Sequence, residues 1–430
     1  MDILIKNIQL IQEPTNPILK KVSIAIENGI ISKISEVPSK QLLPDPDYII
    51  EGKKLIALPP PINSHTHLPM TLLRGISDDK PLLEWLNDIW RIENKLTESL
   101  IELGTKLACL EMIQTGTGGV ADNYFHQNII GKVIQKSGLR GWLGAALLPS
   151  EYVKQGGLKF QKEIFWKVLK LVKTSPLLTA SIAPHSPFTV DEEIILNAAE
   201  LAVKEQIPIM IHASETREEV LKSEEKHGIP PIERLARIGF FNEKLKAIIA
   251  HCTWITQREV HILGENKVIV AWCPVSSQKL AYGGVTPVPE LRTAGAYVSL
   301  GTDGTASNNT LDIWREMREA TNVISADRWD PSIYTATDVL EDTCWTFRRV
   351  FKPNTFIKEG NVADISVLNF YTPRLLPVHN IISNIVYAAN GSDCHSLIIN
   401  GQMIMRNRQI LTLNEEKILE EVEERISELN

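Results

Sequence analysis

PINSHTHLPMTLLRG, residues 61–75, is the stretch from which the fold of this chain can be worked out. It places His65 and His67 two residues apart, shortly after the apolar run of residues 55–58. In an extended strand, the side chains at positions i and i+2 point to the same face of the sheet. Two imidazoles at the end of one strand can therefore bind a single metal ion together, although an isolated His-x-His pair is a weak signal.

The overall composition is that of a large folded protein. The chain has 430 residues, of which 43% are hydrophobic, and this length suits a (β/α)8 barrel with an appended domain. A formal net charge of −7 argues against a nucleic-acid partner, because such partners usually require a basic patch. We expect no membrane segment, since no apolar run approaches about 18 residues and the N-terminus does not resemble a signal peptide. Five scattered cysteines indicate reduced thiols, and these features together predict a cytoplasmic location.

Short apolar runs alternate with amphipathic segments of helical length through most of the chain. Helical spacing of apolar residues is clear in residues 97–114, 160–173, 191–204 and 311–323. Eight candidate strands are each followed by such a pattern, at residues 55–65, 118–124, 140–148, 178–185, 208–215, 246–252, 268–274 and 297–303. Eight units of this kind predict an α/β fold with a TIM-type barrel, and a doubly wound open sheet is the alternative.

The two ends of the chain have a different pattern, with short strands and turns. Residues 1–57 predict a small antiparallel sheet with a hairpin turn at Asn28-Gly29. Strand patterns return in residues 361–370, 383–391 and 395–410, with a second hairpin turn at Asn400-Gly401. We therefore predict one discontinuous β-sandwich domain from residues 1–57 and 358–430, and a barrel over residues 58–357. The acidic tail, residues 414–429, predicts a docked helix with one apolar face made by Ile418, Val422, Ile426 and Leu429.

Ionisable residues recur at the carboxyl ends of the predicted barrel strands. In a barrel these ends meet on one face, which is where active sites lie. Each residue taken alone has a structural explanation, as a buried histidine or a helix cap. So many at the same end of one barrel favour a functional site, and they are His65, His67, His185, His212, Glu215, His251 and Asp303.

Three of these imidazoles and one carboxylate form a set that suits one divalent metal ion. His65, His67, His212 and Asp303 are expected ligands of Zn²⁺, with Fe²⁺ as the alternative, and they leave one position open for water. A bound ion lowers the pKa of such a water, and Glu215 is then placed to move protons. Cys252 and Cys273 have no ligand spacing and are expected to be buried thiols.

Several longer motifs carry a family resemblance. They are HTHLPMTLLRGISDD-x-PLLEWL from His65, APHSP from Ala183, IHASET from Ile211, AHC from Ala250, QKLAYGGVTPV from Gln278 and LGTDGTASNNTLDIWREM from Leu300. With these motifs the chain resembles the amidohydrolase superfamily, specifically its 5′-methylthioadenosine/S-adenosylhomocysteine deaminase branch and the related s-triazine hydrolases. No lysine matches the residue that bridges two metals in binuclear members, so the resemblance implies one metal ion.

The resemblance implies a hydrolytic deaminase that releases ammonia from the adenine ring of a nucleoside, by attack of a metal-bound hydroxide. Asp303 would activate the water, His251 would orient the hydroxide, and Glu215 would protonate a ring nitrogen. Glu93 matches a glutamate that binds ribose hydroxyls, and His185 matches a histidine that contacts the substrate. The alternative is the same chemistry on another amino- or chloro-substituted heterocycle, such as a guanine, a pterin or an s-triazine. A non-catalytic binding protein is disfavoured, because no ligand is lost and Glu215 is present.

Some positions depart from the family pattern and bear on the substrate. The arginines that bind the homocysteine carboxylate in some relatives have no clear match near residues 140–160, where Arg140 is the only arginine. A less polar 5′ group therefore fits better than S-adenosylhomocysteine. The candidate substrates are therefore 5′-methylthioadenosine, 5′-deoxyadenosine and adenosine. Trp254 and Trp272 stand where relatives commonly carry histidines, and each suits either ring stacking or the core. The oligomeric state stays open.

Overall fold

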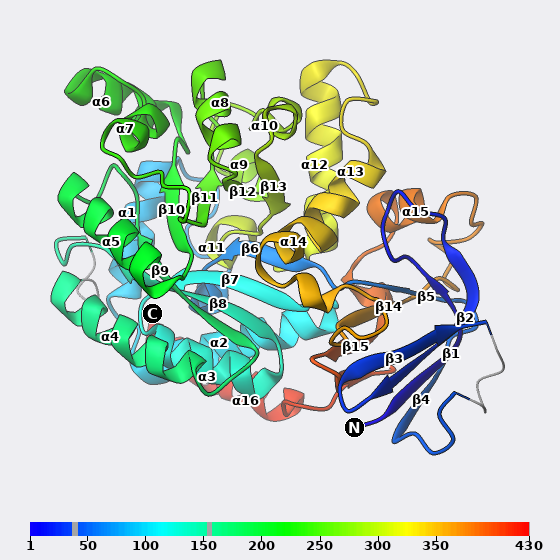
Figure 1. Cartoon of the computed structure of the whole chain (residues 1–430). Coiled ribbons are helices and arrows are strands. Elements are labelled where there is room, and N and C mark those ends of the chain that lie inside the picture. The colour runs from blue at the N-terminus through cyan, green and yellow to red at the C-terminus, as the bar shows by residue number, and fades with distance from the viewer. Residues whose placement is uncertain (37–41, 153–156, 430) are drawn as a thin grey trace.

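The computed structural model describes residues 1–36, 42–152 and 157–429. Residues 37–41 and 430 of the predicted small domain, and residues 153–156 of the predicted barrel, lie outside that description. The described residues form an eight-stranded parallel barrel wrapped by helices, with a separate sheet beside it (Figure 1). Both termini of the chain contribute to that second sheet. The predicted fold class is therefore confirmed, whereas the exact division at residues 57/58 and 357/358 stays a prediction.

The barrel strands follow one another in chain order, and every neighbouring pair is parallel. Hydrogen bonds connect the last strand region to the first, where Asp303 N donates to His65 O at 3.0 Å and Thr302 N donates to Asn63 Oδ1 at 3.1 Å. The eight strands are β6 (Ile62–Thr66), β7 (Gly119–Tyr124), β8 (Arg140–Leu147), β9 (Leu178–Pro184), β10 (Ile209–Ala213), β11 (Ala247–His251), β12 (Ile269–Trp272) and β13 (Tyr297–Leu300).

Most of the helices cover the outside of the barrel and bury their apolar faces against it (Figure 1). The first set comprises α1 (Leu82–Glu93), α2 (Glu98–Gln114), α3 (Gln127–Ser137), α4 (Leu158–Val172), α5 (Glu192–Glu205), α6 (Arg217–His227), α7 (Pro231–Arg237) and α8 (Gln257–Glu265). The second set comprises α9 (Pro274–Lys279), α10 (Val288–Ala294), α11 (Thr305–Asn308), α12 (Ile313–Arg328), α13 (Ala336–Glu341), α14 (Phe347–Phe351), α15 (Ile381–Tyr387) and α16 (Glu415–Arg425). Inside the barrel, a small core packs Trp142 against Phe347 of α14.

The small domain is one nine-stranded mixed sheet that encloses a core of its own. Its strands are β1 (Ile3–Leu10), β2 (Leu19–Glu27), β3 (Ile30–Ser35), β4 (Tyr48–Glu51), β5 (Leu55–Leu58), β14 (Ile365–Asn369), β15 (Cys394–Ile399), β16 (Gln402–Arg406) and β17 (Gln409–Ile410). Both predicted hairpins are present, β2 with β3 and β15 with β16. The N-terminal part is not purely antiparallel as predicted, because β1 pairs in parallel with both β4 and β5.

The predicted first barrel strand, residues 55–65, is in fact two strands in two different sheets. β5 (Leu55–Leu58) pairs with β14 in the small domain, and β6 begins the barrel at Ile62. Residues 59–61 are three prolines, which lack the N–H donor that a continuous strand requires. The apolar run therefore changes sheets at the prolines.

The predicted strand at residues 383–391 is wrong, because helix α15 (Ile381–Tyr387) covers its first half. The Asn380 side chain accepts a hydrogen bond from Ser383 N at 3.0 Å and caps the helix. Its buried residues, Ile385 and Val386, are adjacent in sequence, whereas a half-buried strand would alternate.

The predicted C-terminal helix is present as α16, followed by a short 3-10 turn at Ile426–Leu429. Ile418 packs against Leu103 and Leu110 of α2, while Ile426 is 41% exposed, so the buried face is narrower than predicted. Across the residues that the structure describes, we find no helix with both the length and the apolar character needed to cross a membrane.

Candidate active site

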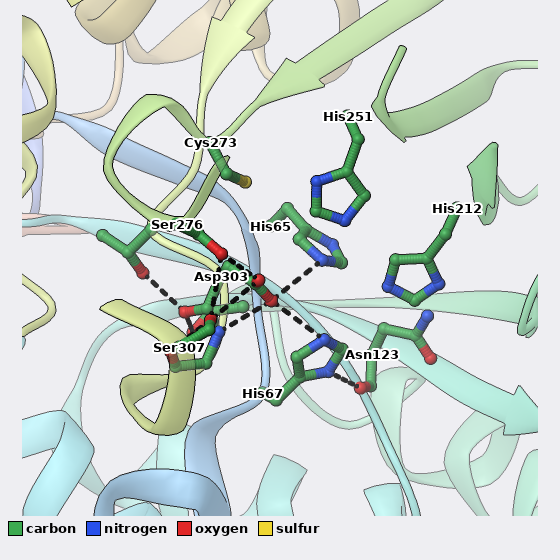
Figure 2. A network of polar contacts seen from close by, with 12 residues as sticks. His65, His67, Asn123, His212, His251, Cys273, Ser276, Asp303 and Ser307 are labelled. Atoms are coloured by element: carbon green, nitrogen blue, oxygen red, sulfur yellow. Dashed lines mark hydrogen bonds and ion pairs between the residues drawn. The ribbon is translucent and has the colours of Figure 1, made fainter. Parts of the chain in front are cut away.

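Three histidines come together at the carboxyl end of the barrel strands. His65 lies in β6, His67 follows it after one residue, and His212 lies in β10. One ring nitrogen from each can be chosen so that all three lie within 4.8 Å of one another. Figure 2 shows the three rings facing a common point, with His251 above them and Asp303 at their side. This spacing suits a single metal ion.

Backbone carbonyls orient two of these rings. His67 Nδ1 lies 2.6 Å from Asn123 O, and His212 Nδ1 lies 2.7 Å from His185 O. A carbonyl only accepts, so it assigns the proton to Nδ1 and leaves Nε2 free to bind a metal. His65 Nε2 is buried without a hydrogen-bond partner among the described residues. A buried polar atom of this kind is costly, and a metal ion would satisfy it, so these residues fit the expected ion.

The protonation states of the histidines follow from their surroundings. Burial lowers the pKa of His65 to about 4 and that of His212 well below its ordinary value, so both rings are neutral at pH 7. Burial acts on His67 as well, but contact with the Asp303 carboxylate outweighs it and raises the pKa of His67 to about 9. Neutral imidazole is the form that binds metals, so His67 would release its Nε2 proton when an ion binds.

Asp303 is held beside the three rings by several donors (Figure 2). Its Oδ1 lies 3.2 Å from His67 Nε2 and 3.6 Å from His65 Nε2. Its Oδ2 accepts hydrogen bonds from the hydroxyls of Ser276 at 2.7 Å and Ser307 at 2.9 Å. Burial raises the pKa of Asp303, but the contacts with His65 and His67 outweigh burial and hold it well below the usual range. The carboxylate is therefore ionised and fixed in orientation.

His251 and Glu215 form a second pair next to the histidine cluster. His251 ends β11, is almost completely buried, and stacks on His212 with ring centroids 5.5 Å apart. Its Nε2 lies 3.7 Å from Glu215 Oε1, and the Glu215 side chain is 24% exposed. The pair thus joins a buried imidazole to a carboxylate that can reach a bound ligand.

A pocket of about 410 Å³ opens directly above these groups, which is within the usual size for a small-molecule site. His67, His212, Glu215, His251 and Asp303 are among the residues that line it. The rest of the lining is largely aromatic and aliphatic, and it includes Trp85, Leu86, Ile89, Trp90, Tyr124, Phe125, Leu148, Phe188 and Tyr282.

Glu93 and His185 also line the pocket. Glu93 is the last residue of α1 and accepts a hydrogen bond from the Tyr124 hydroxyl. Burial raises the pKa of Glu93 to about 7 and lowers that of His185 to about 3. His185 Nδ1 lies 2.9 Å from Thr189 Oγ1, so this neutral ring is also held in place. Every site residue predicted from the sequence therefore lies at this pocket or in the adjoining histidine cluster.

Three further residues that were weighed for the substrate lie outside the pocket lining. Trp272 is a core residue that is 1% exposed, and Trp254 donates from Nε1 to Tyr282 O at 2.8 Å; neither lines the pocket. Arg140 lies at the start of β8, the opposite end of the barrel, where its Nε donates to Asp364 at 2.6 Å. Among the described residues that line the pocket, Lys222 is the only lysine or arginine, and its Nζ lies 2.6 Å from Glu218 Oε1.

Sequence reasoning missed two groups of residues at this site. The aromatic lining includes Trp85, which lies in the motif that starts at His65, and Trp90, which lies outside the quoted motifs; neither received a role. The hydroxyls of Ser276 and Ser307 were missed because serine is common in loops and helix starts. Only their proximity to Asp303 distinguishes them. The predicted burial of Cys252 and Cys273 is confirmed, and burial raises the pKa of both thiols well above the ordinary value.

Comparison with known proteins agrees with this geometry. A curated 5′-deoxyadenosine deaminase of Methanocaldococcus jannaschii is 37% identical over 409 residues, covering 94% of this chain and 96% of the relative. A 5-methylthioadenosine/S-adenosylhomocysteine deaminase of Dictyoglomus turgidum is 37% identical over 437 residues, covering 100% of this chain and 99% of the relative. The crystal structure of an adenosine deaminase from Xanthomonas campestris with bound zinc superposes with a TM-score of 0.94 at 28% identity, covering 100% of this chain and 98% of the other. The profile described as the Amidohydrolase family matches residues 56–404, and the chain therefore belongs to that family.

Proposed function

We propose that this protein is a metal-dependent hydrolytic deaminase of adenine nucleosides. The observation that carries the proposal is the convergence of three histidine nitrogens, an ionised aspartate and a His–Glu pair on one pocket. The homologues named as deaminases, which align over almost the whole chain, support it. The reaction replaces the exocyclic amine of the adenine ring by oxygen from water and releases ammonia.

His65, His67, His212 and Asp303 would hold the metal ion, for which we propose zinc. Three imidazoles and an anionic carboxylate are ligands that Zn²⁺ prefers, and the zinc-bound adenosine deaminase from Xanthomonas campestris supports this choice. A divalent ion held there would lower the pKa of a coordinated water and so supply a nucleophile near neutral pH. Asn123 O and His185 O hold the rings of His67 and His212 for this task.

Three side chains would handle protons during the reaction. Asp303 is ionised at neutral pH, so its carboxylate accepts a proton from water and can return it to the departing ammonia. Glu215 faces the pocket and can deliver a proton to the ring nitrogen beside the reacting carbon. His251 Nε2, at 3.7 Å from Glu215 Oε1, would donate to the attacking oxygen and keep it in position.

The rest of the pocket suits a nucleoside with an apolar 5′ group. The Glu93 carboxylate can accept hydrogen bonds from ribose hydroxyls, and His185 would contact the substrate. The aromatic and aliphatic wall can bury a methylthio or deoxy group. The single lysine of the described lining is paired with Glu218, so a 5′ carboxylate would lack the bidentate donor that binds it well.

The proposal is tested by measuring ammonia release from the zinc-loaded protein. The substrate panel comprises 5′-methylthioadenosine, 5′-deoxyadenosine, adenosine, S-adenosylhomocysteine, guanine and an aminotriazine, with the chelator-treated protein as control. We expect turnover of the first three, weak turnover of S-adenosylhomocysteine, and none after metal removal. Activity on guanine or the triazine with no turnover of any adenosine would contradict the proposed substrate class. Full activity of the metal-free protein would contradict the proposed metal dependence.

A further inference from the structure

The short segment between β10 and α6 carries Glu215 and has an unusual backbone. β10 ends at Ala213, and α6 begins at Arg217 after the N-cap residue Thr216. Ser214 has a φ of +54°, in the left-handed region that residues other than glycine rarely adopt. Such a strained conformation persists only where surrounding contacts hold it.

The Glu219 side chain supplies two of those contacts, beside Trp254 N, which donates to Ser214 O at 2.9 Å. Its Oε1 accepts a hydrogen bond from Ser214 N at 3.1 Å, and its Oε2 accepts one from Glu215 N at 2.8 Å. Both carboxylate oxygens are thus used on two consecutive backbone N–H groups. Glu219 also borders the pocket, where desolvation raises its pKa to about 7 in spite of the backbone donors.

Helix α8 shows the usual role of a threonine at the N-cap followed three residues later by a glutamate. At the start of α8, Thr256 and Glu259 form a capping box, in which Glu259 Oε2 accepts from the N-cap residue's own N–H at 2.8 Å. Thr216 and Glu219 have identical spacing at the start of α6, and Thr216 Oγ1 accepts from Glu219 N at 3.2 Å. The Glu219 carboxylate, however, reaches the two residues before the N-cap, and one of them is Glu215.

We infer that Glu219 is a positioning residue that fixes the backbone of Glu215 and thereby aims its carboxylate at the substrate and His251. The inference rests on the proposed function, in which Glu215 moves the proton. Loss of the Glu219 carboxylate leaves both N–H groups without this acceptor and releases the strained Ser214 conformation. His212 is less dependent on Glu219, because β10 pairs with β11 through its backbone and His185 O holds the His212 ring. The defect should therefore fall on proton transfer and spare metal binding.

The test compares Glu219→Ala and Glu219→Gln with wild type, using Glu224→Gln on the exposed face of the same helix as a matched control. In Glu219→Ala we expect kcat to fall about 10- to 100-fold, because a displacement of about 1 Å in a catalytic group can cost that much. KM and zinc content should stay near wild-type values. Glu219→Gln keeps the volume and one acceptor oxygen, so its kcat should lie between those of Glu219→Ala and wild type.

Amide hydrogen exchange at Ser214 and Glu215 provides a readout that does not depend on activity. We expect faster exchange at both amides in Glu219→Ala and no change in Glu224→Gln. Unchanged exchange, or faster exchange with wild-type kcat, would overturn the inference. If wild type deaminates no adenosine, the proposed function fails, while the exchange rates still decide whether Glu219 holds this backbone.

Discussion

Burial keeps His65 and His212 neutral, and this is the protonation state in which an imidazole binds a metal ion. His67 behaves differently because it shares a short contact with the Asp303 carboxylate. The two hydroxyls of Ser276 and Ser307 hold the far oxygen of that carboxylate. At the scale of single residues, hydrogen bonds and burial therefore set the orientation and the protonation state of each candidate metal ligand before a ligand binds.

Replacing Glu215 by glutamine should separate proton transfer from metal binding. The substitution keeps the size of the side chain but removes the carboxylate that moves the proton. We expect kcat to fall about 10²- to 10⁴-fold, with the zinc content, measured by elemental analysis, unchanged. Asp303→Ala is the comparison variant and should lose both zinc and activity. A zinc-replete Glu215→Gln enzyme that retains wild-type kcat would contradict this role.

Glu93 should make substrate binding depend on pH near neutrality. Burial raises its pKa to about 7, so the group is mostly protonated below that pH and ionised above it. The ionised form accepts hydrogen bonds from ribose hydroxyls more strongly, so KM should fall as the pH rises through about 7. Steady-state kinetics across this range would measure the effect. Glu93→Gln should show a higher KM without this pH step, and a step of equal size in the variant would assign it to another group.

Helix α1 contributes a wall of the pocket, with Trp85, Ile89 and Trp90 among its lining residues. Trp85 Nε1 donates to Ala306 O at 3.2 Å and so attaches the helix to α11. Trp90, five residues later in the same helix, packs edge to face on Tyr152, with ring centroids 5.4 Å apart. The amphipathic pattern of α1 therefore supplies both the attachment and the apolar surface of the site.

Truncating this wall should lower the activity on nucleosides that carry an apolar 5′ group. In Trp90→Ala we expect kcat/KM for 5′-methylthioadenosine to fall at least about tenfold, because a large apolar contact with the substrate is lost. The fall for adenosine, which has a polar 5′ hydroxyl, should be smaller. Trp166→Ala is the matched control, since Trp166 is half-exposed on α4 and does not line the pocket. Equal losses for both nucleosides would contradict a contact with the 5′ group.

A buried ion network joins the small domain to the barrel. Asp364, just before β14, accepts hydrogen bonds from Arg140 Nη2 at 2.8 Å and from Arg348 Nη1 at 3.0 Å. Arg348 also donates to Pro60 O at 2.8 Å, at the point where the chain passes from one sheet to the other. Burial raises the pKa of Asp364, but the two guanidinium groups outweigh burial and lower it below its ordinary value.

Breaking this network should destabilise the whole molecule. Asp364→Asn leaves two buried arginines without their anion, so we expect the free energy of unfolding to fall by about 3–5 kcal/mol in chemical denaturation. Glu359→Gln, at an exposed ion pair with Lys33, is the control and should have little effect. A loss no larger in Asp364→Asn than in the control would contradict the structural role of the network.

The same network has a defined pH dependence. The folded-state pKa of Asp364 lies below its unfolded value, so its contribution is complete above the unfolded pKa and is lost as the pH falls through the folded pKa. Wild type should therefore lose more stability than Asp364→Asn on acidification, measured as the difference in unfolding free energy at each pH. If the unfolding free energies of the two proteins fell by the same amount on acidification, the predicted pH dependence of Asp364 would be contradicted.

Much of this architecture could be read from local sequence patterns. Continuous apolar runs predict buried parallel strands, and His65 and His67 share a face because of the two-residue period of a strand. Each pattern involves residues close in sequence, so no knowledge of packing is needed. Local patterns failed at residues 55–65, where three prolines divide one apolar run between two sheets, and at α15, where a short apolar segment suits either a strand or a helix.

The sequence by itself determined the barrel, the composite small domain and the residue types available as ligands and acids. Only the tertiary structure decided which side chains meet: the serines that hold Asp303, the tryptophans that form the pocket wall, and the Glu219 carboxylate on the Glu215 backbone. It also decided that Arg140 serves the domain junction instead of the substrate. The physical reason is that these contacts join elements far apart in the chain, and their partners follow from how helices pack around the barrel, which no local spacing encodes.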